Sequence, residues 1–249
     1  SSSTDCVIPN QVKIDDDSFI YFSVKQKDLT LKGIVIIGNL HPLNKDVMGW
    51  LRRFKMNTKH NISSMYHSIG GKITINQKEI NLVDGYGYIE GDEGSTFPDK
   101  YIWFNSSGRD YGVSLSIARI KVCDKIHLMG SFLVIKNKTQ EFVFSTLNGL
   151  KVVEIGKYLV TLKKGKYKFK LFLDDFKPLP LLSPIEGSLV GEVKESISIK
   201  VGFELYKRKQ RKFSSYKGEI DNAPDNLLIN EDNSIKVLRQ GSIQIEDSI

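Results

Sequence analysis

The sequence predicts an all-β protein. Short segments that alternate apolar and polar residues, or that are apolar throughout, recur between turn signals along its 249 residues. The clearest alternation sets Ile199, Val201 and Phe203 against Lys200 and Glu204, which is typical of an antiparallel strand with one face in water. A long amphipathic helix is hard to find. These observations favour antiparallel sheets over any helical fold class.

The expected strands follow one another closely, with short turns between them. The pairs Gly70-Gly71, Asn76-Gln77 and Lys164-Gly165 suit hairpin turns, because glycine and asparagine adopt the positive φ that such turns need. Apolar and alternating segments place the strands at residues 18–26, 30–37, 62–68, 71–75, 81–90, 100–104, 111–120, 125–135, 141–145, 151–155, 158–163, 166–173, 187–193 and 197–207.

Three segments depart from the strand pattern. Residues 47–55 are amphiphilic and predict either a helical turn or a connection that carries Trp50 and Phe54 to a rim. Residues 174–184 contain three prolines and predict a loop, because proline cannot continue a central strand. The polar segment from Asp221 shows little pattern, apart from an expected edge strand at 243–245.

The chain is long enough for one large β-domain or two smaller ones, and 40% of its residues are hydrophobic. A shift near residues 119–124, from an aromatic, motif-rich half to a hairpin-rich half, predicts two domains. We place the first at residues 1–120 and the second at 121–249.

Composition excludes several classes of protein. No run approaches the roughly 18 apolar residues that a membrane span needs, and residues 1–9 do not resemble a signal peptide. Cys6 and Cys123 are the only cysteines and lie far apart, which argues against a disulfide framework or a thiolate zinc site. The expected location is the cytoplasm, including the periphery of a membrane.

Lysine-rich runs at 163–170 and 206–212 supply much of the formal net charge of +7. The first run alternates with Tyr167 and Phe169, as expected of a half-buried strand with a solvated lysine face. The second is denser and predicts contact with phosphate groups, for which an anionic membrane surface fits better than nucleic acid. No nucleic-acid-binding motif is present, so no nucleic-acid partner is expected.

The segment 84–103, D-G-Y-G-Y-I-E-G-D-E-G-S-T-F-P-D-K-Y-I-W, concentrates acids, phenols and glycines at strand spacing. Alternate side chains of a strand point to opposite faces, so one face is ionisable and the other nearly bare. On the ionisable face, Glu90 and Asp92 are expected to have Cα atoms about 6 to 7 Å apart. This face carries Asp84, Tyr86, Tyr88, Glu90 and Asp92.

Two motifs together resemble the tocopherol cyclase-like family. They are M-x-x-x-H-x-x-x-S-M-x-H-S-x-x-G from Met56 to Gly71, and G-Y-G-Y-I-E-G-D-E-G-S-T-F-P-D-K-Y-I-W, ending at Trp103. The order S-M-x-H, G-Y-I-E-x-D, S-x-F-P and then W is specific. The stretch D-V-M-G-W-L-R-R-F from Asp46 fits the same family. The resemblance is strongest over residues 40–105.

The resemblance implies a lipocalin-like protein of two antiparallel β-barrel or sandwich domains, related in architecture to carotenoid hydratases. It also implies that the first domain is incomplete at its N-terminus or that its opening section lies outside this polypeptide. Plant and cyanobacterial members close the chromanol ring of vitamin E from a prenylated hydroquinone. At Asn57 and Thr58, where members often carry Glu and Cys, this chain departs from the pattern.

Ring closure of that kind protonates an alkene, after which a phenol oxygen attacks the cation; it needs no redox cofactor and no metal. The acid must be a carboxyl group with a raised pKa, which burial and a neighbouring carboxylate both produce. Glu90 is the expected acid, with Asp92 or His67 as its partner. Aromatic side chains are expected to line the pocket and to stabilise a cation through their π faces, namely Tyr86, Tyr88, Phe97, Trp103 and Trp50.

Structural roles remain open for the same residues. Glu90 and Asp92 could accept hydrogen bonds from backbone amides or from Arg52, Arg53 or Arg109, and the aromatic residues could pack a core. His60 and His67 are seven residues apart and would face opposite sides of one uninterrupted strand, so no shared metal is expected. The alternative to a cyclase or isomerase is a noncatalytic lipid-binding β-barrel protein, and fold alone does not decide between them.

Overall fold

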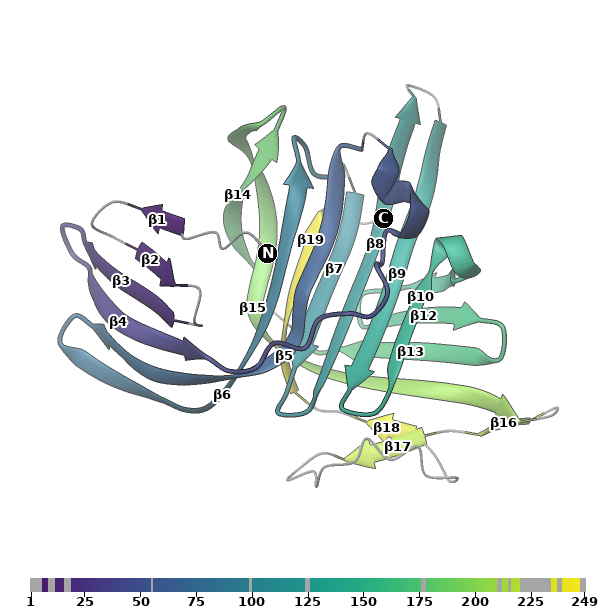
Figure 1. The fold of residues 1–249 in the computed structure, drawn as a ribbon. Coiled ribbons are helices and arrows are strands. Elements are labelled where there is room, and N and C mark those ends of the chain that lie inside the picture. The colour runs from purple at the N-terminus through teal and green to yellow at the C-terminus, as the bar shows by residue number, and fades with distance from the viewer. Residues whose placement is uncertain are drawn as a thin grey trace.

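The computed structural model describes residues 6–8, 12–15, 19–54, 56–98, 100–123, 126–175, 178–209, 212–214, 216–219, 234–236 and 239–246. Within these residues the regular structure is β-strand apart from two short 3₁₀ helices, which confirms the all-β prediction (Figure 1). None of the described helices is long and apolar enough to cross a membrane. The chain start, part of the basic run 206–212 and most of the polar segment from Asp221 lie outside the described residues.

The elements have the following bounds: β1 Cys6–Ile8, β2 Val12–Asp15, β3 Phe19–Lys25, β4 Thr30–Ile37, η1 Gly49–Arg53, β5 Thr58–Ile75, β6 Lys78–Gly94, β7 Lys100–Ser107, β8 Tyr111–Cys123, β9 Ile126–Asn137, β10 Glu141–Ser145, η2 Thr146–Asn148, β11 Lys151–Ile155, β12 Leu159–Lys164, β13 Tyr167–Leu173, β14 Leu179–Ile185, β15 Ser188–Lys209, β16 Lys212–Ser214, β17 Tyr216–Glu219, β18 Ser234–Lys236 and β19 Arg239–Glu246.

The first sheet has six antiparallel strands in chain order, β1 to β6. Asn76 and Gln77 join β5 to β6 with φ values of 46° and 74°, as a type I′ hairpin turn requires. The expected turn at Gly70-Gly71 is wrong, because both residues lie inside β5 at an irregularity of the strand pairing. At Gly71 a side chain would meet Ile34 O at 2.2 Å, so close approach of β4 explains this glycine.

The second sheet contains eleven strands, nine of them in the order β10-β9-β8-β7-β19-β15-β13-β12-β11. Strands β12 and β13 run across β8 and β9 in the view of Figure 1. Between them lies the main core, which includes the fully buried Leu115, Leu133, Leu162, Phe169 and Phe203. In β13, Phe169 is buried between the partly exposed Lys168 and Lys170, as the half-buried interpretation of the first lysine run predicts.

A second apolar cluster joins the two sheets. Ile62, Met65 and Tyr66 of β5 pack against Phe132 and Val134 of β9, and the segment before η1 contributes further apolar side chains. This contact places the Gly94 end of β6 beside β7 and β8, where the ionisable face of β6 is covered.

Two expectations for the second half of the chain are wrong. The proline-rich segment forms strand β14, which pairs only with β15 among the described residues; an edge strand tolerates proline because its outer side needs no donor. The expected edge strand at 243–245 is part of β19, which instead lies between β7 and β15.

The sheets also divide the chain at a different place from the predicted domains. Sheet membership changes between β6 and β7, that is, between Gly94 and Lys100, whereas residue 120 lies in β8, which pairs with β9 across the predicted boundary. The division into 1–120 and 121–249 stays a prediction.

Candidate functional site

A pocket with a cavity volume of about 30 Å³ lies where the open end of the β5–β6 hairpin, opposite its turn, meets β7 and β8. It combines three ionisable side chains with apolar and aromatic walls. The residues that line it are Thr58, His60, Glu90, Asp92, Phe97, Pro98, Tyr101, Trp103, Ser116 and Ala118.

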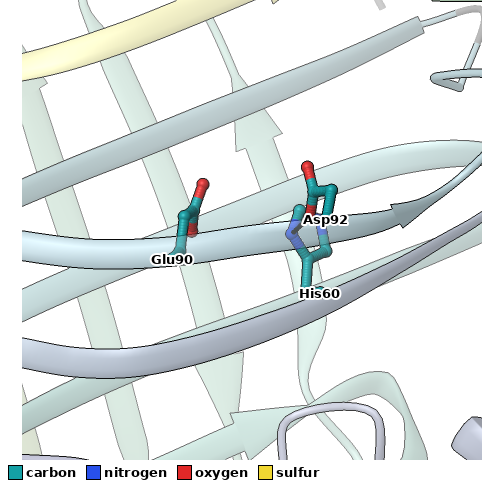
Figure 2. Close-up of side chains that lie close together, drawn as sticks. All are labelled: His60, Glu90 and Asp92. Atoms are coloured by element: carbon teal, nitrogen blue, oxygen red, sulfur yellow. Dashed lines mark ion pairs between the residues drawn. The ribbon is translucent and has the colours of Figure 1, made fainter. Parts of the chain in front are cut away.

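His60 and Asp92 form the first part of the site. They are direct partners in the pairing of β5 with β6, so their side chains share one face, and Figure 2 shows them facing each other. His60 Nδ1 and Asp92 Oδ1 are 2.6 Å apart, but Nδ1 has no partner in normal hydrogen-bond geometry. The two groups form an ion pair whenever His60 is protonated, because charge attraction needs less alignment than a hydrogen bond, whereas the neutral imidazole keeps one ring nitrogen able to accept a proton. Burial lowers the pKa of His60, yet the carboxylates of Asp92 and Glu90 outweigh it and the net shift is upward.

Glu90 and Tyr88 form the second part. Tyr88 Oη donates a hydrogen bond of 2.5 Å to Glu90 Oε2, and the hydroxyl of Ser114 lies 3.1 Å from the same phenol oxygen. Burial raises the pKa of Glu90, even though the Tyr88 hydrogen bond and the charge of His60 favour its ionised form. Burial and the charge of Glu90 also raise the pKa of Tyr88, so the phenol stays neutral and acts as a donor.

Aromatic rings form the walls of the pocket. Phe97 and Tyr101 meet edge to face with ring centroids 5.9 Å apart. The Trp103 ring is 6.3 Å from that of Tyr88, which is itself outside the pocket lining and reaches the site through its hydrogen bond to Glu90. The indole N–H of Trp103 is near enough to Glu90 to favour its ionised form, but it is not aligned for a hydrogen bond. A small ligand in the pocket would therefore meet two carboxyl groups, one imidazole and several aromatic rings.

Three of the predicted site residues lie elsewhere. His67 is buried on the other side of the hairpin, with Nδ1 3.1 Å from Ser64 Oγ, and burial followed by the charge of His41 lowers its pKa. Two irregularities in the pairing of β5 between Ile62 and His67 shift its alternation. Gly87 makes room for the His67 ring, since a Cβ there would lie 2.2 Å from Nε2. The glycine-bearing face of β6, which was expected to be nearly bare, therefore packs against the His67 ring.

Tyr86 and Trp50 are also outside the pocket lining. Tyr86 accepts a hydrogen bond of 3.3 Å from Arg109 Nε on the exposed part of β6. Trp50 belongs to η1, is 59% exposed and packs edge to face on Phe54. The expectation of a rim position for Trp50 and Phe54 agrees with their exposure, but a substrate-binding role for Trp50 gains no support.

Two of the three arginines considered as partners of the two acids, Arg52 and Arg109, bind other groups. Arg52 pairs with Asp46 and donates a 2.5 Å hydrogen bond to the backbone oxygen of His60, which fixes that part of β5. Arg109 pairs with Asp84 at 3.3 Å. Glu90 is instead hydrogen-bonded by a neutral phenol, and this is why its ionised form is poorly compensated.

His60, Glu90 and Asp92 could also offer three ligand atoms to a metal ion, since these atoms lie within 4.8 Å of one another. Ligand atoms around a tetrahedral zinc ion stand roughly 3.4 Å apart, given bond lengths near 2.0 to 2.1 Å. The shorter 2.6 Å contact of His60 with Asp92 is that of an ion pair, and the two groups would have to separate around a metal. The expectation of no metal site stays a prediction.

The sequence reasoning assigned no role in the site to His60 or Tyr101. His60 was missed because it was compared only with His67 on its own strand, whereas its neighbour is Asp92 on the next one. Counting back from the Asn76-Gln77 turn would have paired β5 with β6, but the irregularities in β5 hide the register.

Comparison of the chain with protein-family models found no matching family, and comparison with curated proteins found no significant match.

Proposed function

We propose that this protein is a tocopherol cyclase-like, lipocalin-like enzyme that binds a prenylated aromatic or other isoprenoid ligand and protonates its alkene. The observation that carries the proposal is Glu90, an acid with a raised pKa that lines an aromatic pocket beside an ion-paired histidine. The family resemblance of residues 40–105 supports the substrate class.

Glu90 is suited to be the acid because burial and the neighbouring Asp92 keep a proton on it at higher pH than usual. It transfers this proton to one carbon of the alkene, whose π electrons form the new C–H bond. The other carbon becomes a tertiary cation. Trp103 and Tyr101 line the same pocket, and their π systems are suited to stabilise that charge.

His60 is suited to be the base, in place of the expected His67. Asp92 faces one ring nitrogen and supports the positive charge that His60 gains on protonation. The phenol oxygen of the ligand attacks the cation, a C–O bond forms, and the phenol proton passes to His60, which must enter this step as the neutral imidazole. Return of that proton from His60 to Glu90 restores the starting state, so the reaction is an isomerisation without net oxidation or proton uptake.

The direct test is incubation with a prenylated hydroquinone, with chromanol measured by chromatography and mass spectrometry. We expect Glu90→Gln to lower turnover by roughly 100-fold or more, as loss of a general acid does. Glu79→Gln is the matched control, since Glu79 is on the same strand but is half-exposed and pairs with Lys72. Turnover should be unchanged by a chelator.

Other outcomes would redirect the proposal. If wild-type protein makes no chromanol but carries an extractable isoprenoid lipid that Glu90→Gln retains, the protein is the noncatalytic lipid-binding alternative. If Glu90→Gln turns over like wild type, another group is the acid. Loss of activity with chelator and its return with zinc would assign the three ionisable residues to a metal.

A further inference from the structure

The most apolar exposed part of the molecule is the hairpin of β14 and the start of β15, residues 179–193, which we name the apolar hairpin. In Figure 1 it lies at the top of the molecule beside the label β14. Among the residues that the structure describes, 20 large hydrophobic side chains are exposed, and six of them fall on it, namely Leu179, Leu181, Leu182, Ile185, Leu189 and Val190. Such a concentration marks a surface that meets another apolar phase.

The strand register shows that the body of the protein covers only one face of the apolar hairpin. Leu181 pairs with Val193, and Val193 is buried against Tyr101 and Ala118. Leu182 lies on the opposite face, where it pairs with the exposed Glu192 and is itself 69% exposed. The outer face therefore keeps its leucine in water in the isolated chain.

The composition of the apolar hairpin identifies what it meets. Pro180 and Pro184 remove donors from the edge strand β14, which opposes the addition of a strand from a second copy or a peptide. Residues 179–193 contain no aromatic residue and no arginine, which are the usual anchors of protein interfaces. Aliphatic side chains without such anchors suit acyl chains.

The charge of the apolar hairpin also restricts which lipid headgroups it can contact. Residues 179–193 carry two charges, those of Glu186 and Glu192, and the next two residues in the pairing of β14 with β15 are Lys194 and Glu195. The net charge of the paired region is negative, so an anionic headgroup would be repelled. This differs from the basic run 206–212, from which contact with an anionic membrane was expected. The apolar hairpin instead suits a neutral or zwitterionic lipid surface.

The tip of the apolar hairpin is attached to the pocket wall. Gly187 N donates a 2.7 Å hydrogen bond to Ser95 O, and Glu186 N donates a 3.1 Å bond to Thr96 Oγ1. The next residues, Phe97 and Pro98, line the pocket. The cavity of about 30 Å³ is small for an aromatic ring, given that a cavity of roughly 150 Å³ binds benzene, so most of an isoprenoid ligand must lie outside it.

We propose that the apolar hairpin inserts into a neutral lipid surface and delivers the apolar ligand from that surface to the pocket beside Phe97. The delivery role rests on the proposed function, whereas lipid binding does not. Lipid binding is therefore measured first, without substrate.

The experiment is flotation of the protein with phosphatidylcholine vesicles. We expect Leu182→Ser with Val190→Ser to weaken vesicle binding by roughly tenfold or more, because two exposed aliphatic side chains are lost from the contact. Val83→Ser with Val153→Ser is the matched control. Its two valines are 77% and 58% exposed, compared with 69% and 72% for Leu182 and Val190, and they lie on β6 and β11. The control should bind like wild type.

Three results would overturn the proposal: no flotation with phosphatidylcholine, equal loss of binding in the control, or a dimer in size-exclusion chromatography that the hairpin variant dissociates. Turnover separates this proposal from the proposed function. With detergent-dispersed substrate the hairpin variant should match wild type, and with vesicle-borne substrate it should be slower. Vesicle binding without any turnover would defeat the proposed function alone.

Discussion

The two ends of the ionisable face of β6 carry the same kinds of side chain in different surroundings. At one end, Asp92 faces His60 with side chains only 24% and 19% exposed. At the other, Asp84 faces Arg109 with 73% and 64% exposed. Each acid has one basic partner, so the main difference between the ends is access to water.

Cover by β7 and β8 creates that difference. Near Asp84, the ionisable face of β6 is exposed to water. Near Glu90, the same face lies against the aromatic side chains of Trp103 and Tyr101. Charges interact more strongly where water is excluded, and an isolated charge costs more there. One strand can therefore carry a solvated ion pair at Asp84 and a candidate acid, Glu90, six residues later.

The largest effect on turnover is expected when aspartate is replaced by asparagine at the covered end of the face and compared with the same substitution at the exposed end. Asp92→Asn removes the charge that supports protonated His60, so turnover of a prenylated hydroquinone should fall roughly 100-fold. The pKa of His60 should also fall, since Asp92 raises it, and the limb of the pH–rate profile that His60 governs should move to lower pH. Asp84→Asn should leave both quantities as in wild type.

An unmoved pH limb in Asp92→Asn, at reduced turnover, would assign Asp92 a purely structural role. Equal losses in both variants would show that the two ends do not differ in function.

A smaller effect is expected on stability. Because the folded-state pKa of Glu90 is raised, its contribution to the free energy of unfolding is fully present below the ordinary glutamate pKa. That contribution is lost as pH rises through the folded-state pKa. Glu90→Gln keeps an acceptor for Tyr88 without the charge, so it should stabilise the fold at pH 8 by roughly 1 kcal/mol. Urea unfolding at pH 5 and pH 8 measures it.

Glu79→Gln is the control for this measurement, since the exposed Glu79 should give no such pH-dependent gain. Destabilisation by Glu90→Gln at pH 8 would mean that Glu90 is held as a well-compensated anion, which is contrary to the acid role.

The sequence was enough to predict most of the strands and to point to the ionisable face of β6, because alternation and residue type are local properties. It placed Tyr88, Glu90, Asp92, Phe97 and Trp103 in one site, and the structure brings them together. His60 depends on pairing between strands, which two irregularities of β5 disguise. Such irregularities leave no clear mark in a single sequence.

The arrangement of the sheets was beyond local patterns for a similar reason. Strand β19 lies between β7 and β15, although about 130 residues of chain separate it from β7. The polar sequence around β19 contains no pattern that predicts this position in the sheet. The prolines of β14 correctly exclude this segment from the centre of a sheet, but they do not exclude it from a strand. An edge position satisfied the same rule.

The smallest expected effect is a shift in the pH–rate profile when one tyrosine hydroxyl is removed at the covered end of β6. Removal of a tyrosine hydroxyl at the exposed end is the control. Tyr88→Phe removes a hydrogen bond that favours the ionised form of Glu90, so the pKa of Glu90 should rise. The limb of the pH–rate profile that Glu90 governs should then move to higher pH, with the site otherwise intact. Tyr86→Phe removes a hydroxyl bound by the exposed Arg109 and should leave the profile where it is. A shift to lower pH in Tyr88→Phe would mean that the phenol stabilises protonated Glu90, and the donor and acceptor of that hydrogen bond would have to be exchanged.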